Sequence, residues 1–148
     1  MPGELRVGCY ETDTTPPLGT HLIGGFGPRP RVDIHDPLHA KAIVIDNGVC
    51  PVALATIDLC MIGRPHLDAA KDRIARRCGI PPQNVLISAP HTHAGPAAVS
   101  ILGVDIDTAY ADSLPDKIAD AVECALLRLE PCRLVYGTGE VDQVFNRR

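Results

Sequence analysis

Apolar positions recur along the chain with two different periods, and the shorter one predicts strands. Alternating apolar and polar residues over Leu5–Glu11 indicate a strand with one buried face. Two further apolar runs, Leu38–Asp46 and Cys50–Asp58, are rich in β-branched residues and predict two more strands. Because Asp46-Asn47-Gly48 between them is typical of a type I′ hairpin turn, we expect these two strands to pair antiparallel.

The longer period, close to 3.6 residues, predicts helices. Pro65–Cys78 carries its apolar residues on one face, and Gly79 follows as a helix-ending residue. The short apolar run Val85–Ser88 comes next and predicts a buried strand. A strand, a helix and a strand in this order form a right-handed crossover, so we expect the two strands to be parallel.

A second helix is predicted from a cap at Asp107 to about Glu130, where Pro131 stops it. Arg133–Gly137 is predicted as a last strand. Together the elements indicate an α/β fold in which helices pack on a mixed β-sheet. We interpret residues 1–148 as one domain, because the length suffices for a single core and no repeat or linker divides it.

The segment from Thr12 to about Asp36 has no periodicity and is predicted as a loop. At about 25 residues it is long for a compact domain, and such loops are typically functional or mobile. It contains His21 and His35, and His39 opens the strand that follows.

The composition is that of a globular protein and argues against several functional classes. A net charge of −4 without any basic block argues against nucleic-acid binding. No apolar run approaches the roughly 20 residues that span a bilayer. Since no signal peptide is visible, we expect a cytoplasmic protein, or a secreted one if its start is processed. The six cysteines form no C-x-x-C pair and are expected to be reduced core thiols.

The most informative chemistry follows the predicted strand Val85–Ser88. Pro90 ends strand pairing there, and His91 and His93 come directly after it. If the backbone stays extended across Thr92, both imidazoles face the same way. Histidine is a common ligand of Zn²⁺, so the pair predicts part of a metal site at the end of a strand.

Other candidate ligands have no spacing that supports them; they are His21, His35, His39, Asp58 and Tyr136. We favour Asp58 as a helix cap or a supporting hydrogen-bond acceptor over a direct role in a site. Neither a G-x-S-x-G elbow nor a phosphate-binding glycine loop occurs. The residues alone therefore supply part of a metal site and no nucleophile.

The order of motifs resembles the neutral (non-lysosomal) ceramidase family over nearly the whole chain. The most distinctive motif is His91-Thr-His-Ala-Gly-Pro96, which in the family usually reads THTHSGP. The other matching segments are Gly8, Asp13–Pro17, Gly24-Gly25, Ile34–Ile45, Thr56–Asp58, Asn84–Ser88, Leu129–Pro131, Arg133–Gly139 and Asn146-Arg147. Pro90 and Ala94 depart from the family, which has threonine and serine at these positions.

The resemblance implies that the chain is the N-terminal part of the catalytic domain of a zinc-dependent amidase. Such an enzyme hydrolyses an N-acyl amide such as ceramide to a fatty acid and sphingosine, a reaction of sphingolipid metabolism. His91 would bind Zn²⁺, His93 would contact the reacting part of a small-molecule or lipid amide, and Arg147 would position polar substrate groups. The family's remaining zinc ligands and active-site serine lie downstream of the Asn-Arg motif, so the rest of a catalytic domain is implied as a partner.

Two alternatives stay open on the sequence. One is a metal-dependent amidohydrolase of another type, in which H-x-H ends the first strand of a barrel. The other is a non-catalytic, truncated module without activity of its own. With one or two imidazoles as its only ligands, the chain by itself is expected to bind zinc weakly.

Overall fold

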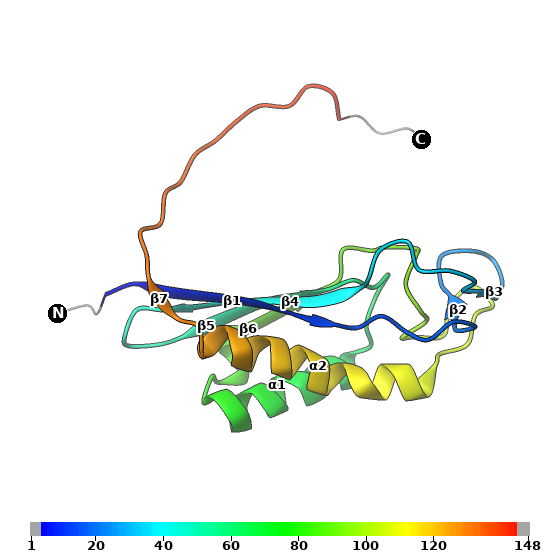
Figure 1. Cartoon of the computed structure of the whole chain (residues 1–148), viewed down its shortest axis with the longest axis horizontal. Helices are drawn as coiled ribbons and strands as arrows, with labels where there is room; N and C mark the ends of the chain where they lie inside the picture. The colour runs from blue at the N-terminus through cyan, green and yellow to red at the C-terminus, as the bar shows by residue number, and fades with distance from the viewer. Residues whose placement is uncertain (1–3, 145–148) are drawn as a thin grey trace.

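A five-stranded mixed sheet is the centre of the fold, seen in a computed structural model that describes residues 4–144 (Figure 1). The strand order is β6-β5-β4-β1-β7. Only β5 and β6 are parallel, and the other neighbours pair antiparallel. The bounds are β1 (Arg6–Asp13), β4 (His39–Asp46), β5 (Val52–Ile57), β6 (Val85–Ser88) and β7 (Glu130–Pro131). The predicted α/β fold class is confirmed.

Two helices cover one face of this sheet (Figure 1). Helix α1 (Arg64–Cys78) ends at Gly79, whose φ of 68° gives the left-handed cap that glycine adopts without strain. Helix α2 (Thr108–Leu126) begins at Asp107, whose carboxylate accepts a hydrogen bond of 3.0 Å from the Tyr110 backbone N–H. Pro115 is buried inside α2 and does not interrupt it. Helix α2 ends before the predicted Glu130, and β7 follows.

The core lies between the sheet and the helices. Strands β4 and β5 point mostly small residues at the helices, namely Ala40, Ala42, Val44, Ala53, Ala55 and Ile57, all buried. In β1 the corresponding position is Gly8, where an added Cβ would lie 2.0 Å from the Ala125 carbonyl oxygen of α2. Small side chains thus let α2 lie close to the strands, and larger residues of the helices fill the core.

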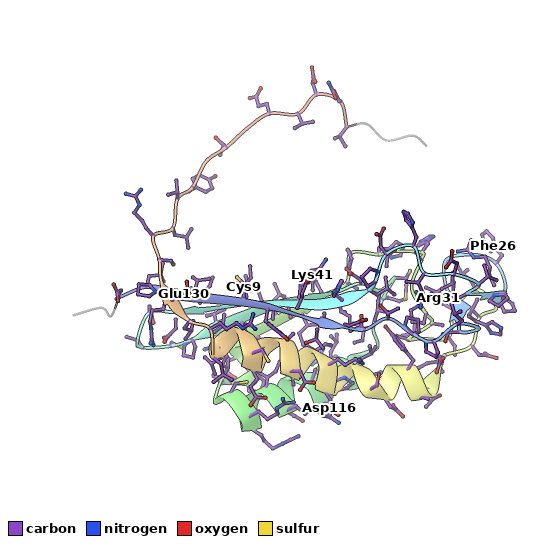
Figure 2. All side chains as sticks on the ribbon, viewed as in Figure 1. Cys9, Phe26, Arg31, Lys41, Asp116 and Glu130 are labelled. Carbon is purple, nitrogen blue, oxygen red and sulfur yellow. The ribbon has the colours of Figure 1, made fainter. Side chains whose placement is uncertain are left out.

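The opposite face of the sheet is not covered by any described segment. Cys9 and Lys41 lie on it (Figure 2), together with Ile43, Leu54 and Leu86, whose exposed fractions are 42%, 39% and 61%. A shallow cavity of about 610 Å³ lies over these strands. The sheet therefore has one face packed and one apolar face open.

Three sequence predictions about local structure were wrong. Arg133–Gly137 forms no strand: the chain leaves the sheet after β7 and stays extended and exposed through residue 144 (Figure 1), because no neighbouring strand pairs with it. The last paired residues of β4 and β5 are Ile45 and Val52, so their connection is longer than a two-residue turn. All six cysteines, which lie within the described range, are free, but only Cys60 is buried.

No helix among residues 4–144 is long and apolar enough to cross a membrane.

The long irregular segment between β1 and β4 is ordered by contacts rather than by its own periodicity. It contains a short antiparallel pair, β2 (His21–Leu22) and β3 (Arg29–Pro30). Outside this segment, one 3-10 turn, η1 (Pro82–Asn84), comes directly before β6. The Tyr110 hydroxyl of α2 donates 2.9 Å to the Thr14 carbonyl, and burial raises the pKa of Tyr110 to about 12. The start of the irregular segment is therefore attached to helix α2.

Candidate metal centre

The parallel pair β5 and β6 brings two distant segments of the chain together at one edge of the sheet. Thr56 and Ser88 are the last paired residues, and both chains leave the sheet beyond them. The Leu59 carbonyl then accepts hydrogen bonds from the backbone N–H groups of His91 (3.1 Å) and Thr92 (3.2 Å). These bonds fix the segment after β6 against the segment after β5, so residues near Cys60 and His91 become neighbours.

His91 has a left-handed backbone, with φ of 69°. This region costs a residue other than glycine about 1 kcal/mol or more, and it is held here by the two bonds to Leu59. The ring nitrogen Nδ1 lies 3.0 Å from the Cys60 carbonyl oxygen and 3.4 Å from the Cys60 sulfur. The backbone is thus not extended at His91, and the side chain is directed at Cys60 by a turn.

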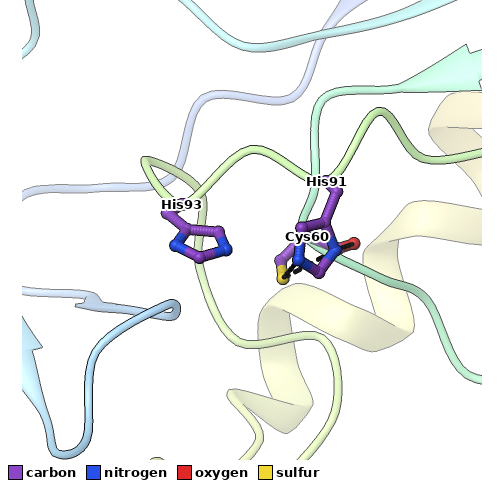
Figure 3. A group of neighbouring side chains, drawn as sticks. All are labelled: Cys60, His91 and His93. Carbon is purple, nitrogen blue, oxygen red and sulfur yellow. Dashed lines mark hydrogen bonds between the residues drawn. The ribbon is translucent and has the colours of Figure 1, made fainter. Parts of the chain in front are cut away.

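The two imidazoles nevertheless lie together, as the H-x-H spacing predicted. The ring centroids of His91 and His93 are 5.0 Å apart at an angle of 64°, so one edge faces the other ring (Figure 3). With Cys60 they form a group in which one ligand atom of each residue lies within 4.8 Å of the others. Cys60 is buried, whereas both histidines are exposed.

The segment between β1 and β4 closes against His93. The Arg29 guanidinium donates 3.2 Å to the His93 carbonyl, and the Ile23 N–H donates 3.1 Å to the Gly95 carbonyl. Gly24 packs directly on the imidazole: a Cβ at this position would lie 2.3 Å from His93 Cγ. The position of the ring is therefore set by a glycine from the long irregular segment.

Gly24→Ala is expected to displace the His93 ring, since the methyl group and the ring cannot occupy the same space. Gly19→Ala is the matched control: Gly19 has a similar φ of 89°, against 101° for Gly24, but a Cβ there meets nothing within 4 Å. Both variants should lose stability from backbone strain. Histidine ring signals in NMR spectra should shift only for Gly24→Ala, and equal spectra for the two variants would contradict this role of Gly24.

Cys60 is the residue of this group that sequence reasoning missed. It has no motif, and it lies 31 positions from His91. The parallel pairing of β5 and β6 was predicted, however, and residues that follow neighbouring parallel strands meet at the same edge of a sheet. That rule, applied to residues just beyond Asp58, would have placed Cys60 next to the histidines.

Asp58 supports the structure near this edge and does not cap α1, whose N-cap residue is Gly63 and whose start has no side-chain cap among the described residues. Its carboxylate accepts 2.9 Å from the His39 N–H and lies 3.7 Å from the Lys41 ammonium. It lines a cavity of about 440 Å³ with Thr92 and Ala94. The supporting hydrogen bond expected for Asp58 is thus present, and the helix cap is not.

The remaining candidates do not join the group. His21, His35 and His39 are not members of the Cys60–His91–His93 cluster, which is the one such group of histidine, cysteine and acidic residues among residues 4–144. Tyr136 is exposed in the segment that follows β7. Arg147 lies outside the described residues, so its predicted role in positioning substrate stays a prediction.

The donor atoms of the cluster fit Zn²⁺ better than Mg²⁺ or Ca²⁺. One sulfur and two imidazoles are the donors that zinc takes in proteins, whereas the harder ions take oxygen. The contact between Nδ1 and the Cys60 carbonyl also has the form of the outer hydrogen bond that orients a metal-binding histidine. The residues present are therefore compatible with a zinc ion.

Known proteins resemble this chain in sequence and in fold, while no protein-family model matches it. The neutral ceramidase of Pseudomonas aeruginosa is 34% identical over 127 residues, which cover 78% of this chain and 19% of that protein. Its crystal structure superposes with a TM-score of 0.76 at 24% identity, over 86% of this chain and 22% of that one. A structure of a ceramidase complexed with C2 gives a TM-score of 0.81 at 26% identity, over 94% of this chain and 24% of that one. The chain thus spans about a fifth of the length of the curated relative.

Proposed function

Because this chain belongs to the neutral ceramidase family, we propose that it is the N-terminal portion of a zinc-dependent amide hydrolase. The observation that carries the proposal is the cluster of imidazoles at the carboxyl end of β6, inside the segment that matches the family's His-Thr-His motif. Carboxyl ends of strands are where α/β proteins hold their reacting groups.

His91 is proposed as the zinc ligand. Since a carbonyl oxygen only accepts hydrogen bonds, the Cys60 carbonyl fixes the proton on Nδ1 of His91 and leaves Nε2 with a free lone pair. The outer hydrogen bond holds the ring in one orientation before the ion arrives, which lowers the cost of binding. A bound zinc ion supplies Lewis-acid polarisation of an amide carbonyl and a bound water whose pKa is near 7.

His93 and Arg147 are proposed to act on the substrate. The His93 ring lies beside that of His91 and is held there by Gly24 and Arg29, so it is positioned to contact a group near the metal. Arg147 would bind polar groups of the substrate. The substrate class is an N-acyl amide, with ceramide as the example named by the relatives, and the products are a carboxylic acid and an amine.

A non-catalytic module is the second candidate, and the open apolar face of the sheet favours it. Ile43, Leu54 and Leu86 are exposed there, as in a domain that packs against another protein segment. The amidohydrolase barrel has no such support: β4 pairs antiparallel with both of its neighbours, and both helices lie on one face of the sheet.

The proposal is tested with the protein encoded by the complete reading frame that contains these 148 residues. Hydrolysis of short-chain ceramide and of a simple N-acyl amide is measured before chelation, after chelation, and after adding back Zn²⁺ or Mg²⁺. We expect hydrolysis to be lost on chelation and restored by Zn²⁺ alone. A zinc-loaded protein that cleaves neither amide, or an activity indifferent to chelation, would contradict it.

A further inference from the structure

We propose that the segment after β7, residues 133–144, closes over the open apolar face of the sheet as an intramolecular strap. In the structure the strap is open and extended, and it rises from β7 on the side of the sheet opposite to the helices (Figure 1). No residue of the strap belongs to the histidine cluster, so its closure is independent of the proposed function.

The open face of the sheet has the composition of a covered surface. A sheet face that meets water normally carries polar residues. Here one row across four strands consists of Cys9, Ile43, Leu54 and Leu86, which are direct neighbours in the pairing registers. All four are exposed, and all four line the cavity over the strands. A continuous apolar row of this kind indicates a surface that another segment covers.

The strap carries an apolar group that can cover this row. Leu134, Val135 and Tyr136 are all exposed. They lie shortly after Cys132, whose backbone N–H donates 2.9 Å to the Leu5 carbonyl and so attaches the start of the strap to the edge of the sheet. Two apolar surfaces of one chain, both in contact with water, gain free energy when they bury each other.

The charges of the two surfaces are also complementary. Among the charged residues that line the cavity, Lys41 and Arg128 outnumber Glu11, so the face carries a net positive charge. Beyond its first residue, the strap has Glu140 and Asp142 as its only charged residues. Opposite charges of this kind favour one orientation of the strap over others.

The order of residues along the strap follows the order of rows on the face. Strand β7 pairs with β1 at Val7, the row of Cys9 comes next along β1, and the pair of Glu11 and Lys41 comes after it. A strap that runs in this direction places its apolar residues over the apolar row and its acidic residues near Lys41. Residues 137–139 connect the two groups and need no contact of their own.

Tethering makes the strap a more favourable cover than a second molecule. Fully extended, the strap spans about 40 Å, whereas the open face is about 15 Å wide from β1 to β6. Its attachment at β7 gives it an effective concentration on the order of millimolar at the face. A second copy of the chain would have to bind from its much lower concentration in solution.

The test uses Cys9 of the reduced 148-residue chain as a reporter, because its thiol lies on the open face and is exposed while the strap is open. Cys50, exposed and outside the cavity, is the internal reference. We expect alkylation of Cys9, followed by mass spectrometry, to be at least fivefold faster in the double variant Leu134→Asp/Tyr136→Asp than in the unaltered chain, with Cys50 unchanged. Leu18→Asp, which replaces a similarly exposed leucine far from β7 in sequence, should change neither rate. Equal Cys9 rates in the unaltered chain and the double variant would overturn the proposal.

A measurement on the unaltered chain covers the case in which the double variant does not fold. Nuclear Overhauser contacts are expected between the Tyr136 ring and the methyl groups of Ile43 and Leu54, and their absence would overturn closure. Light scattering should show a monomer. A dimer, with protection of Cys9 that increases with protein concentration, would overturn the strap in favour of a second copy as the cover of the face.

Discussion

His91→Ala is expected to remove zinc and amide hydrolysis together. The substitution deletes the ring that the Cys60 carbonyl orients, and with it the nitrogen Nε2 that is proposed to bind the ion. Loss of a direct ligand should weaken zinc binding by at least about 100-fold. Zinc content after dialysis and hydrolysis by the complete protein are the two measurements, and retained zinc stoichiometry would exclude His91 as a ligand.

Two further variants separate the ligand role from the backbone role of His91. His91→Asn keeps a residue that tolerates the left-handed φ of 69°, so it should fold at least as well as His91→Ala yet still lose zinc. His35→Ala is the control for a histidine outside the cluster, since its side chain is fully exposed. It should leave zinc content and hydrolysis unchanged.

Gly8→Ala is expected to cause a large loss of stability. The new Cβ would lie 2.0 Å from the Ala125 carbonyl oxygen and 2.9 Å from the Arg128 carbonyl carbon. Both atoms belong to the backbone, which cannot rotate away as a side chain can. The end of α2 must therefore move off β1, at a cost of about 3 kcal/mol or more in the free energy of unfolding.

Thermal and urea unfolding measure this cost, with Gly137→Ala as the control. Gly137 lies in the exposed segment after β7, where a Cβ meets nothing within 4 Å, so its replacement should leave stability unchanged or slightly raised. If Gly8→Ala unfolds at the same urea concentration as Gly137→Ala, α2 does not pack on β1 as closely as described.

The elements that the sequence predicted correctly are those whose own periodicity determines them. Strand β6 and the C-terminal end of α1 match their predicted bounds, because a buried apolar run and a glycine cap are local signals. Arg133–Gly137 carries a strand-like pattern, yet a strand requires a partner and none is present among the described residues. Pattern alone cannot report whether that partner exists.

The candidate site likewise has residues that the sequence predicted and residues that it did not. His91 and His93 were predicted because they are adjacent in sequence and follow a strand. Cys60 and Gly24 were missed because they reach the histidines only through tertiary contacts, one through the parallel pairing of β5 and β6 and one through the irregular segment after β1. The left-handed turn at His91 likewise depends on the Leu59 carbonyl from another strand's end.

The parallel pairing of β5 and β6 also determines when the cluster can form during folding. Cys60 and His91 are separated by the whole of α1, and parallel strands pair only after the connecting helix has packed back on the sheet. Such non-local closure is slow compared with helix or hairpin formation. Zinc would therefore stabilise the finished fold by slowing its unfolding, and it would leave the rate of folding unchanged.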